Sequence, residues 1–188
     1  TYTTVNTVPG KTVQNSTYGN YAPYTDVTGA LPYLVKADKI AEKPEVPDTE
    51  AAKYATTVTC KTVSSAYTDG VANVNGVSDV YTLKLGTSKL NGIATITLPA
   101  GTTEVTYYAV GWKGTSAQLQ FSVAGSVVGT QSLAANTGAT GSSPYTMTVS
   151  DSDHYTFSLG SALEADTEVT VETTGSAYRA ILFGIQAK

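Results

Sequence analysis

The 188-residue chain has few of the residues on which most catalytic sites depend. It contains one histidine, one cysteine, one tryptophan and one methionine, and only 14% of its residues are charged. The single Cys60 rules out an intrachain disulfide and is expected to pack in a strand-lined core, with a reactive or intermolecular thiol as the alternative. Because nucleophilic catalysis needs a base beside the nucleophile, we predict that the protein is not an enzyme.

Positive charge and long apolar runs are also scarce. The 11 Lys and Arg are outnumbered by 15 Asp and Glu, and they form no basic stripe that would neutralise phosphates. No apolar run reaches the roughly 20 residues of a membrane-spanning helix, and neither an initiator Met nor a signal-like segment stands at Thr1. We expect a mature or excised piece with no nucleic-acid partner and no membrane span. Low charge with abundant Thr, Ser, Gly and Tyr is typical of extracellular or cell-surface proteins.

The abundant residues predict strands, because β-branched and aromatic side chains favour a pleated, half-buried surface. After residue 50, apolar and polar residues alternate in nine segments, and no stretch keeps a helical period for more than two turns. The predicted fold is all-β, a two-sheet antiparallel β-sandwich of jelly-roll type with about nine strands. The nine segments are Val58–Cys60, Tyr81–Leu85, Ala94–Leu98, Val105–Ala109, Leu119–Val123, Tyr145–Val149, Tyr155–Leu159, Val169–Val171 and Arg179–Ile185.

Local patterns refine this prediction. The segment Val105–Val110 is apolar on both faces, which favours a strand inside a sheet, whereas Gln118, Gln120 and Ser122 predict one wet face for their strand. The small residues of Ala134–Pro144 predict a long surface loop. Turns are expected at Asp69-Gly70, Asn75-Gly76, Asn91-Gly92, Pro99–Gly101 and Ala124-Gly125.

The composition divides the chain into three parts. We predict an extended N-terminal arm over residues 1–40, a spacer rich in prolines and acids over residues 41–50 (AEKPEVPDTE), and the β-sandwich domain over residues 51–188. In the arm, Leu31, Tyr33 and Val35 share one face of a predicted strand. Such a strand is a candidate for donation to the sheet edge of another copy.

Three further tyrosines of the arm, Tyr18, Tyr21 and Tyr24, recur at the three-residue period of a polyproline II helix, which places them on one side to lie along a groove. These patterns favour head-to-tail assembly of the protein with copies of itself into a pilus-like filament. The alternatives are an arm packed on its own sandwich and the remnant of a preceding domain.

Three blocks of sequence resemble a known type of module. They are YTLKLGTSKLNG (Tyr81–Gly92), YYAVGWKG (Tyr107–Gly114) and YRAILFGI (Tyr178–Ile185). With them, residues 57–188 resemble the β-sandwich modules of secreted, multidomain surface proteins of gut-dwelling Gram-negative bacteria. That resemblance implies a non-catalytic jelly roll, similar in shape to carbohydrate-binding modules, that displays or attaches something outside the cell.

One pair of aromatic residues suits a sugar ligand. Trp112 and Tyr108 lie on the same side of a strand by alternation, and aromatic faces stack on the apolar C–H faces of sugar rings. We therefore name Trp112 and Tyr108 as the candidate glycan platform of a carbohydrate-binding or adhesin module. The alternative is that both rings belong to the core or cover a sheet edge.

Other polar residues are weaker candidates. Asp69, Asn73, Asn75 and Asp79 are oxygen ligands of the kind that Ca²⁺ prefers, but they lack EF-hand spacing, so no cofactor is expected and Ca²⁺ is the one candidate. His154 stands beside Asp151 and Asp153, where a solvated turn residue is expected rather than a catalytic base. The carboxylates Glu104, Glu164 and Glu168 are interpreted as exposed strand or turn charges rather than a glycosidase pair.

Overall fold

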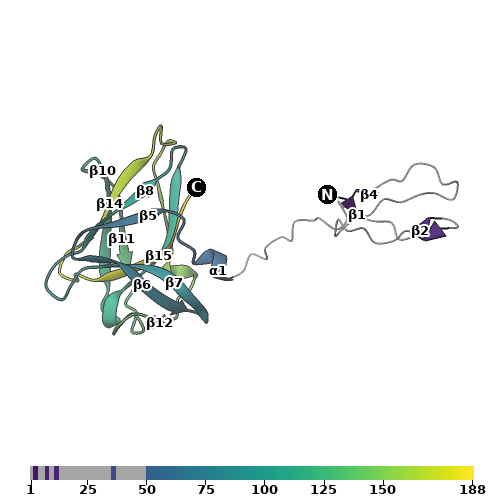
Figure 1. Cartoon of the computed structure of the whole chain (residues 1–188). Helices are drawn as coiled ribbons and strands as arrows, with labels where there is room; N and C mark the ends of the chain where they lie inside the picture. Colours follow the sequence, from purple (N-terminus) through teal and green to yellow (C-terminus); the bar gives the residue numbers. More distant parts are fainter. Residues whose placement is uncertain (1, 4–6, 9–10, 13–34, 37–49) are drawn as a thin grey trace. The chain divides into compact units, whose positions relative to one another are not determined.

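The structure is a computed structural model, and it describes residues 2–3, 7–8, 11–12, 35–36 and 50–188. The chain divides into two compact units, Thr1–Asp48 and Thr49–Lys188 (Figure 1). In the first unit β1 (Tyr2–Thr3) pairs with β4 (Val35–Lys36), and β2 (Thr7–Val8) pairs with β3 (Lys11–Thr12), both antiparallel. Val35 thus lies opposite Thr3. The predicted arm residues Leu31, Tyr33, Tyr18, Tyr21 and Tyr24, and all of the predicted spacer except Glu50, lie outside the described residues.

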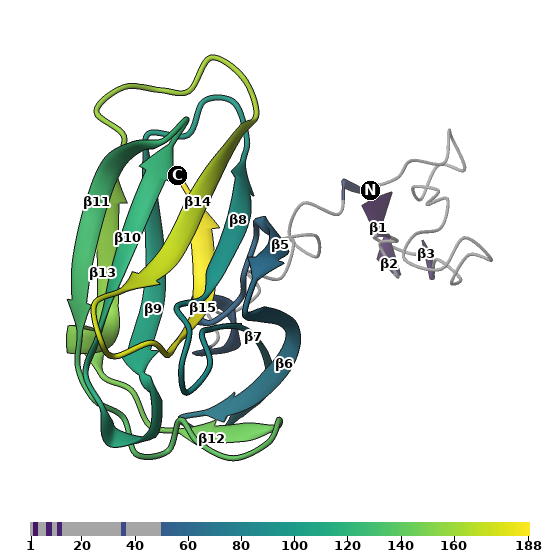
Figure 2. The same cartoon turned by 90° about the vertical axis from the view of Figure 1, so that its left-hand side faces the viewer.

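The second unit is a β-sandwich of two sheets, which confirms the predicted fold class. Figure 2 shows the five-stranded sheet in front of the six-stranded one. The five-stranded sheet has the order β11 (Ser126–Leu133), β10 (Ala117–Val123), β14 (Thr167–Thr174), β8 (Ile93–Leu98), β5 (Thr59–Ser64). The six-stranded sheet has the order β12 (Tyr145–Met147), β6 (Ala66–Val74), β7 (Val77–Leu85), β15 (Ala180–Ala187), β9 (Glu104–Gly111), β13 (His154–Ser158).

Each of the nine predicted strand segments overlaps a strand, and β6 and β11 were missed. The strands of both sheets pair antiparallel except that β12 runs parallel to β6, and an isolated parallel bridge joins Gly111 to Ala135. The prediction of a turn at Asp69-Gly70 is wrong, since both residues lie inside β6. Gly70 is needed there for space, because a Cβ on it would lie 2.6 Å from the hydroxyl oxygen of Thr82. The strand β11 escaped notice because it is a sheet edge whose residues are mostly exposed or half-buried.

The two tightest hairpins follow the predicted turn chemistry. Asn75 and Gly76 both have positive φ, as do Ala124 and Gly125, which is the backbone of a two-residue type I′ turn. The strand β9 is buried along Val105–Gly111 and lies between β15 and β13, so its predicted interior position is confirmed. The strand β10 alternates buried residues with exposed or half-buried ones over Ala117–Phe121, which confirms its wet face.

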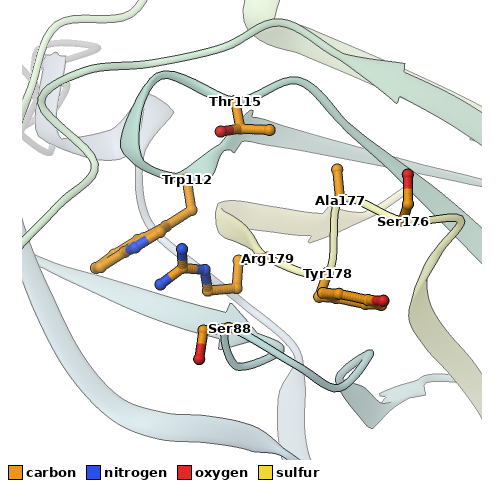
Figure 3. Close-up of a pocket in the computed structure, with 7 residues that line it drawn as sticks. All are labelled: Ser88, Trp112, Thr115, Ser176, Ala177, Tyr178 and Arg179. Atoms are coloured by element: carbon orange, nitrogen blue, oxygen red, sulfur yellow. The ribbon is translucent and has the colours of Figure 1, made fainter.

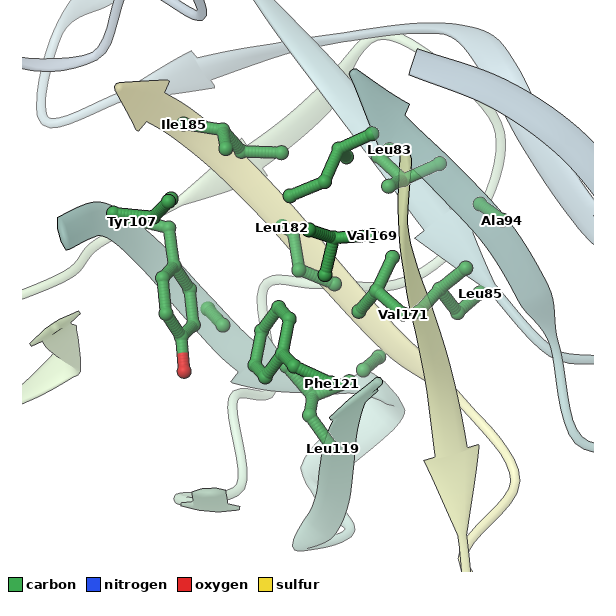
Figure 4. Close-up of a cluster of buried hydrophobic side chains, with 14 of the residues drawn as sticks. Leu83, Leu85, Ala94, Tyr107, Leu119, Phe121, Val169, Val171, Leu182 and Ile185 are labelled. Atoms are coloured by element: carbon green, nitrogen blue, oxygen red, sulfur yellow. The ribbon is translucent and has the colours of Figure 1, made fainter. Parts of the chain in front are cut away.

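A first hydrophobic cluster fills the space between the sheets. Figure 4 shows Phe121, Val169 and Leu182 gathered there, from strands of both sheets. Phe121 is 1% exposed, and its ring centroid lies 5.1 Å from that of Tyr107 and 4.5 Å from that of Phe157. We call this cluster the inner core; its buried members are Leu83, Leu85, Ala94, Ile96, Leu98, Val105, Tyr107, Ala109, Ala117, Leu119, Phe121, Leu133, Phe157, Val169, Val171, Ala180, Leu182 and Ile185.

A second hydrophobic cluster is formed by the other side-chain set of the six-stranded sheet. It includes Tyr108, Val110, Ile181 and Phe183, which alternate with inner-core residues along β9 and β15. Tyr54, next to the short helix α1 (Glu50–Lys53), and the segment 134–149 complete it. We call this cluster the outer core; its buried members are Tyr54, Ala72, Val74, Val80, Tyr108, Val110, Trp112, Ala139, Tyr145, Met147, Val149, Ile181 and Phe183.

The side chain of Asn75 joins three parts of the outer core by hydrogen bonds. The side-chain amide of Asn75 donates to the Tyr54 hydroxyl and to the Val149 carbonyl, each at 2.9 Å, and its oxygen accepts from the Val149 N–H at 3.0 Å. The segment predicted as a surface loop, Ala134–Pro144, has little regular structure, yet its Ala139 is fully buried. No helix within residues 50–188 is long and apolar enough to cross a membrane.

Candidate functional site

Three loops meet at one end of the sandwich. Because β7 and β9 flank β15 and both run antiparallel to it, the β7–β8 and β9–β10 loops emerge beside the β14–β15 loop. They enclose a pocket of about 210 Å³ (Figure 3). Its lining residues are Ser88, Trp112, Thr115, Ser176, Ala177, Tyr178 and Arg179.

The pocket is where the three sequence blocks quoted above converge. Ser88 belongs to the first block, Trp112 to the second, and Tyr178 and Arg179 to the third. Glycines of these blocks allow the close approach. A Cβ on Gly86 would lie 1.7 Å from the Tyr178 carbonyl oxygen, and one on Gly111 would lie 2.1 Å from the Thr115 carbonyl oxygen. Both positions require glycine for space, so the loops are packed backbone against backbone.

A buried threonine ties two of the loops together. The hydroxyl of Thr173, a residue 1% exposed, donates to the Tyr178 carbonyl at 2.7 Å and accepts from the Gly92 N–H at 2.9 Å. These bonds join the β7–β8 loop to the β14–β15 loop. This side of the pocket is thereby held in place by hydrogen bonds within the protein.

The Trp112 side of the pocket is fixed in the same way. Trp112 begins a short 3₁₀ turn, Trp112–Gly114, in which Lys113 has a φ of 55°. The Trp112 N–H donates to the Arg179 carbonyl at 3.2 Å, and the Lys113 N–H donates to the Ala139 carbonyl at 2.8 Å. The segment 134–149 therefore supports the pocket as well as the outer core.

Two cations flank the indole of Trp112. The Lys84 ammonium lies 4.1 Å from the ring centroid, and the Arg179 guanidinium carbon lies 5.9 Å from it. Figure 3 shows the guanidinium beside the indole. The rings of Trp112 and Tyr145 form a T-shaped pair, with centroids 5.4 Å apart. Burial lowers the pKa of Lys84, and the neighbouring charge of Arg179 lowers it further.

The predicted open platform of Trp112 and Tyr108 is wrong in its geometry. Trp112 is 4% exposed and Tyr108 6% exposed, so both take the core position that was the alternative. The Tyr108 ring is stacked on both sides, by His154 at 4.4 Å and by Phe183 at 5.5 Å, so it has no free face. Trp112 nevertheless lines the pocket, whereas Tyr108 does not.

The four residues predicted as Ca²⁺ ligands do not gather around one point. Asn75 spends its side-chain amide on the outer core, and Asp69 and Asp79 are exposed on β6 and β7. Asn73 lies in β6 opposite Thr146. Within residues 50–188 no three His, Cys, Asp or Glu side chains gather as a metal site would require. The absence of a cofactor stays a prediction.

The candidate catalytic groups are spread over the molecule. His154 lies in β13 against Tyr108, and its pKa is lowered by burial and by Lys188, against the opposing effect of Asp151. Glu104 forms an ion pair with Lys188 at 3.8 Å in the six-stranded sheet, whereas Glu168 lies in β14 of the other sheet. Glu164 is exposed in the loop before β14. The prediction that the protein is not an enzyme stays a prediction.

Cys60 is half-buried and lines a separate groove with Thr56, Val58, Thr68 and Tyr81. Burial raises the pKa of its thiol, partly offset by a hydrogen bond with Tyr81. The thiol therefore stays protonated at neutral pH, as a packed cysteine would.

Sequence reasoning missed Lys84, Ser88, Tyr178 and Arg179 as site residues. The available signal was that all four fall in the blocks used for the family resemblance. Their convergence could not be seen, because it depends on β15 lying between β7 and β9.

Comparison with known proteins gave no family and only distant structural likeness. No protein-family model matches the chain, and no curated protein matches it. A GH87 α-1,3-glucanase catalytic domain in complex with nigerose is 12% identical, with a TM-score of 0.39, over 71% of this chain and 28% of that one. A carbohydrate-binding module, CBM36, in complex with calcium and xylotriose is 9% identical, with a TM-score of 0.35, over 74% of this chain and 98% of that one.

An active-site mutant of a family two carbohydrate esterase from Clostridium thermocellum is 16% identical, with a TM-score of 0.35, over 56% of this chain. The matched part spans about a quarter of the esterase and glucanase chains (26% and 28%). At these TM-scores the likeness says nothing about function, which has to be argued from the pocket. The resemblance to secreted modules of gut bacteria, and the extracellular location it implies, stay predictions.

Proposed function

We propose that the protein is a non-catalytic carbohydrate-binding module whose ligand enters the pocket at the β7–β8, β9–β10 and β14–β15 loops. The observation that carries the proposal is the lining of that pocket. It combines two aromatic side chains, Trp112 and Tyr178, with the hydroxyl-bearing Ser88, Thr115 and Ser176.

This lining matches the surface of a sugar. A sugar ring has apolar C–H faces that pack on aromatic side chains and a rim of hydroxyls that exchange hydrogen bonds with Ser and Thr. Tyr178 is half-buried, so part of its ring is available for contact. The pocket, about 210 Å³, is smaller than the roughly 300–1,000 Å³ of pockets for drug-sized ligands, which suits a terminal sugar rather than a long segment.

The same lining supports binding without chemistry. None of the described residues that line the pocket is Asp, Glu, His or Cys. Glycoside hydrolysis uses two carboxyl groups on either side of the bond that breaks, and acyl transfer uses a nucleophile with a base. A pocket of this composition holds a sugar and releases it unchanged.

The test is affinity electrophoresis through gels that contain soluble polysaccharides, read together with a glycan array. Wild-type protein is expected to be retarded by at least one glycan. Tyr178→Ala removes the half-buried ring, and Ser176→Phe fills the exposed rim, so both are expected to abolish retardation. Ser126→Phe, at the exposed start of β11 near the other end of the sandwich, is the matched control and is expected to bind normally. Retardation that survives both pocket changes, in folded protein, would overturn the proposal.

A second function, self-assembly through the N-terminal arm, is favoured by the open edge of β5. This strand pairs with β8, its other edge meets no strand within residues 50–188, and five of its six residues are exposed. Beside it lies the groove of Thr56, Val58, Cys60, Thr68 and Tyr81, about 380 Å³ in volume. An edge with an adjacent groove is what a donated strand requires.

The test of assembly is sedimentation of the full chain against two variants. Deletion of residues 1–39 is expected to leave both cores intact, because the buried core residues of the part that the structure describes all lie in 54–185. The deletion is expected to leave a folded monomer. The double variant Tyr33→Asp with Val35→Asp is expected to do the same, since burying an unpaired charge in the partner's sheet edge is costly. Oligomers that persist in both variants would exclude strand donation by the arm.

A further inference from the structure

The two cations beside Trp112 have no partner of opposite charge among residues 50–188. Within residues 50–188 neither Lys84 nor Arg179 forms an ion pair, although the chain carries 15 Asp and Glu and a net charge of −4. Their cationic groups flank one indole ring, at 4.1 Å and 5.9 Å from its centroid. Two positive charges beside one ring repel each other. No carboxylate of residues 50–188 offsets this repulsion by forming an ion pair with either cation.

The position of the two cations is set by rigid elements. Lys84 lies within β7, and Arg179 directly precedes β15, where Ala180 pairs with Leu85. The Arg179 carbonyl accepts the Trp112 N–H, so the backbone under the guanidinium is fixed. Both side chains are half-buried, and cation–π attraction accounts for part of their placement: to Trp112 for both, and for Lys84 also to Tyr67, whose ring centroid lies 5.2 Å from the ammonium. Cation–π attraction to one ring does not require two cations.

A ligand with a negative charge would complete this arrangement. Arg179 lines the pocket, and a guanidinium presents a planar fork of N–H donors that matches a carboxylate or sulfate through two parallel hydrogen bonds. Lys84 does not itself line the pocket, but its ammonium, 4.1 Å from the ring centroid of the lining residue Trp112, adds a second positive charge near it. The hydroxyl groups of Ser88 and Thr115 remain for the neutral part of the sugar.

We propose that the pocket selects glycans whose bound sugar carries an anionic group, a uronic acid carboxylate or a sulfate, held by Arg179 with Lys84 as the second cation. The proposal rests on the carbohydrate-binding function proposed above and names the class of its ligand. Neutral glycans with the same sugar backbone are expected to bind this pocket more weakly.

The experiment is a glycan array with neutral, uronate-containing and sulfated members, followed by calorimetric titration of matched pairs. A uronate oligosaccharide is compared with its methyl ester, and a sulfated one with its desulfated form. Neutralising the anionic group is expected to weaken binding about tenfold or more, because hydrogen bonds to charged groups are the stronger ones. The pair that shows the loss distinguishes the carboxylate from the sulfate.

The protein variants separate binding from folding. Arg179→Gln is expected to weaken binding of the charged glycan about tenfold. Arg179→Lys, which keeps the charge and loses the fork, is expected to fall between it and wild type. Lys61→Gln removes an equal charge from the exposed edge strand β5 and is expected to bind as wild type. Melting temperatures measured on all three keep a folding defect from being mistaken for lost binding.

Each outcome decides between the two proposals. Equal binding of neutral and charged forms, still abolished by Tyr178→Ala, would overturn the anionic ligand and leave the carbohydrate-binding function standing. Charged glycans bound equally by wild type and Arg179→Gln would likewise overturn it. An array with no bound glycan of any kind would overturn both.

Discussion

The two faces of the six-stranded sheet are both apolar, but they are covered by different kinds of structure. The inner core is closed by a second sheet, whose strands β8, β10 and β14 place regular rows of side chains against it. The outer core is closed by Tyr54, the three-residue strand β12 and irregular chain of the segment 134–149. The inner core makes the sandwich, and the outer core fixes the loop that carries Trp112.

This difference assigns different consequences to the same kind of substitution. Loss of an inner-core side chain removes contacts between two sheets and weakens the whole domain. Loss of an outer-core contact loosens the segment 134–149. That segment is hydrogen bonded to the loop of Trp112 through the Lys113 N–H and the Ala139 carbonyl. The comparison therefore predicts a global effect in one case and a local effect, felt at the pocket, in the other.

The largest effect is expected from Phe121→Ala. This ring is 1% exposed between Tyr107 and Phe157, and deletion of a buried phenylalanine costs about 3–5 kcal/mol. Urea unfolding followed by circular dichroism measures the loss, and Phe121→Leu is expected to lose less. Glycan affinity of the protein that remains folded is expected to stay unchanged. A loss below about 1 kcal/mol would mean that the inner core does not hold the sheets together.

An intermediate effect is expected from Asn75→Gly. Glycine keeps the left-handed backbone at φ 49° but removes three side-chain hydrogen bonds to Tyr54 and Val149, a loss of about 1–3 kcal/mol. Hydrogen exchange is expected to speed up at Met147–Val149 while the amides of β14 stay protected. Asn75→Asp, which keeps an acceptor for the Val149 N–H, is the graded control. Equal acceleration in β14 would show that the two cores are one cooperative unit.

The contrast between the cores also explains what the sequence could predict. Period-two alternation finds strands with one buried face, and it found β8, β10 and β14, whose buried apolar residues all belong to the inner core. It could not say what would cover the second face of β9 and β15. That answer depends on Met147 and Ala139, which come from a segment that the sequence predicts only as a strand and a surface loop.

The candidate site was predicted in part for the same reason. Trp112 was singled out as an aromatic ring that could stack on a sugar, and it does line the pocket. Tyr108, in β9, belongs to the same outer core as Trp112, and the cover of that face buries it between His154 and Phe183. Arg179 and Lys84 became site residues only through the pairing of β7 with β15, which no local pattern encodes.

A small effect on stability with a large effect on binding is expected from Lys84→Met. The pKa of Lys84 is lowered by burial and by Arg179, so the folded protein disfavours its charge. Lys84→Met loses the cation–π contact with Trp112, but it also removes a disfavoured charge and keeps a long apolar side chain. The two effects offset each other, so the free energy of unfolding is expected to change by less than about 1 kcal/mol. Binding of an anionic glycan is expected to weaken several-fold. A large loss of stability would show that Lys84 serves the outer core instead.

The smallest effect is expected from pH, through His154. Its pKa is lowered below the ordinary 6.5, chiefly by burial, so the unfolded chain takes up the proton first. The contribution of neutral His154 is complete above about pH 6.5 and is lost as the pH falls toward the folded-state pKa. His154→Phe keeps an aromatic ring against Tyr108 but has no group that titrates. When the pH is lowered from about 7.5 to about 5.5, the melting temperature of the variant is expected to fall less than that of the wild type. Equal losses would contradict the shift.

The most direct test of the account uses the single tryptophan of the chain as a reporter of the pocket. An amide correlation spectrum contains one indole N–H signal, from Trp112, and it is followed while the best anionic glycan of the array is added. The account predicts a saturable shift of this signal, with the dissociation constant found by calorimetry, while the amides of the β10–β11 hairpin at Ala124 and Gly125 stay in place. Saturating binding that leaves the Trp112 signal unmoved would contradict it, because the glycan would then occupy some other part of the molecule.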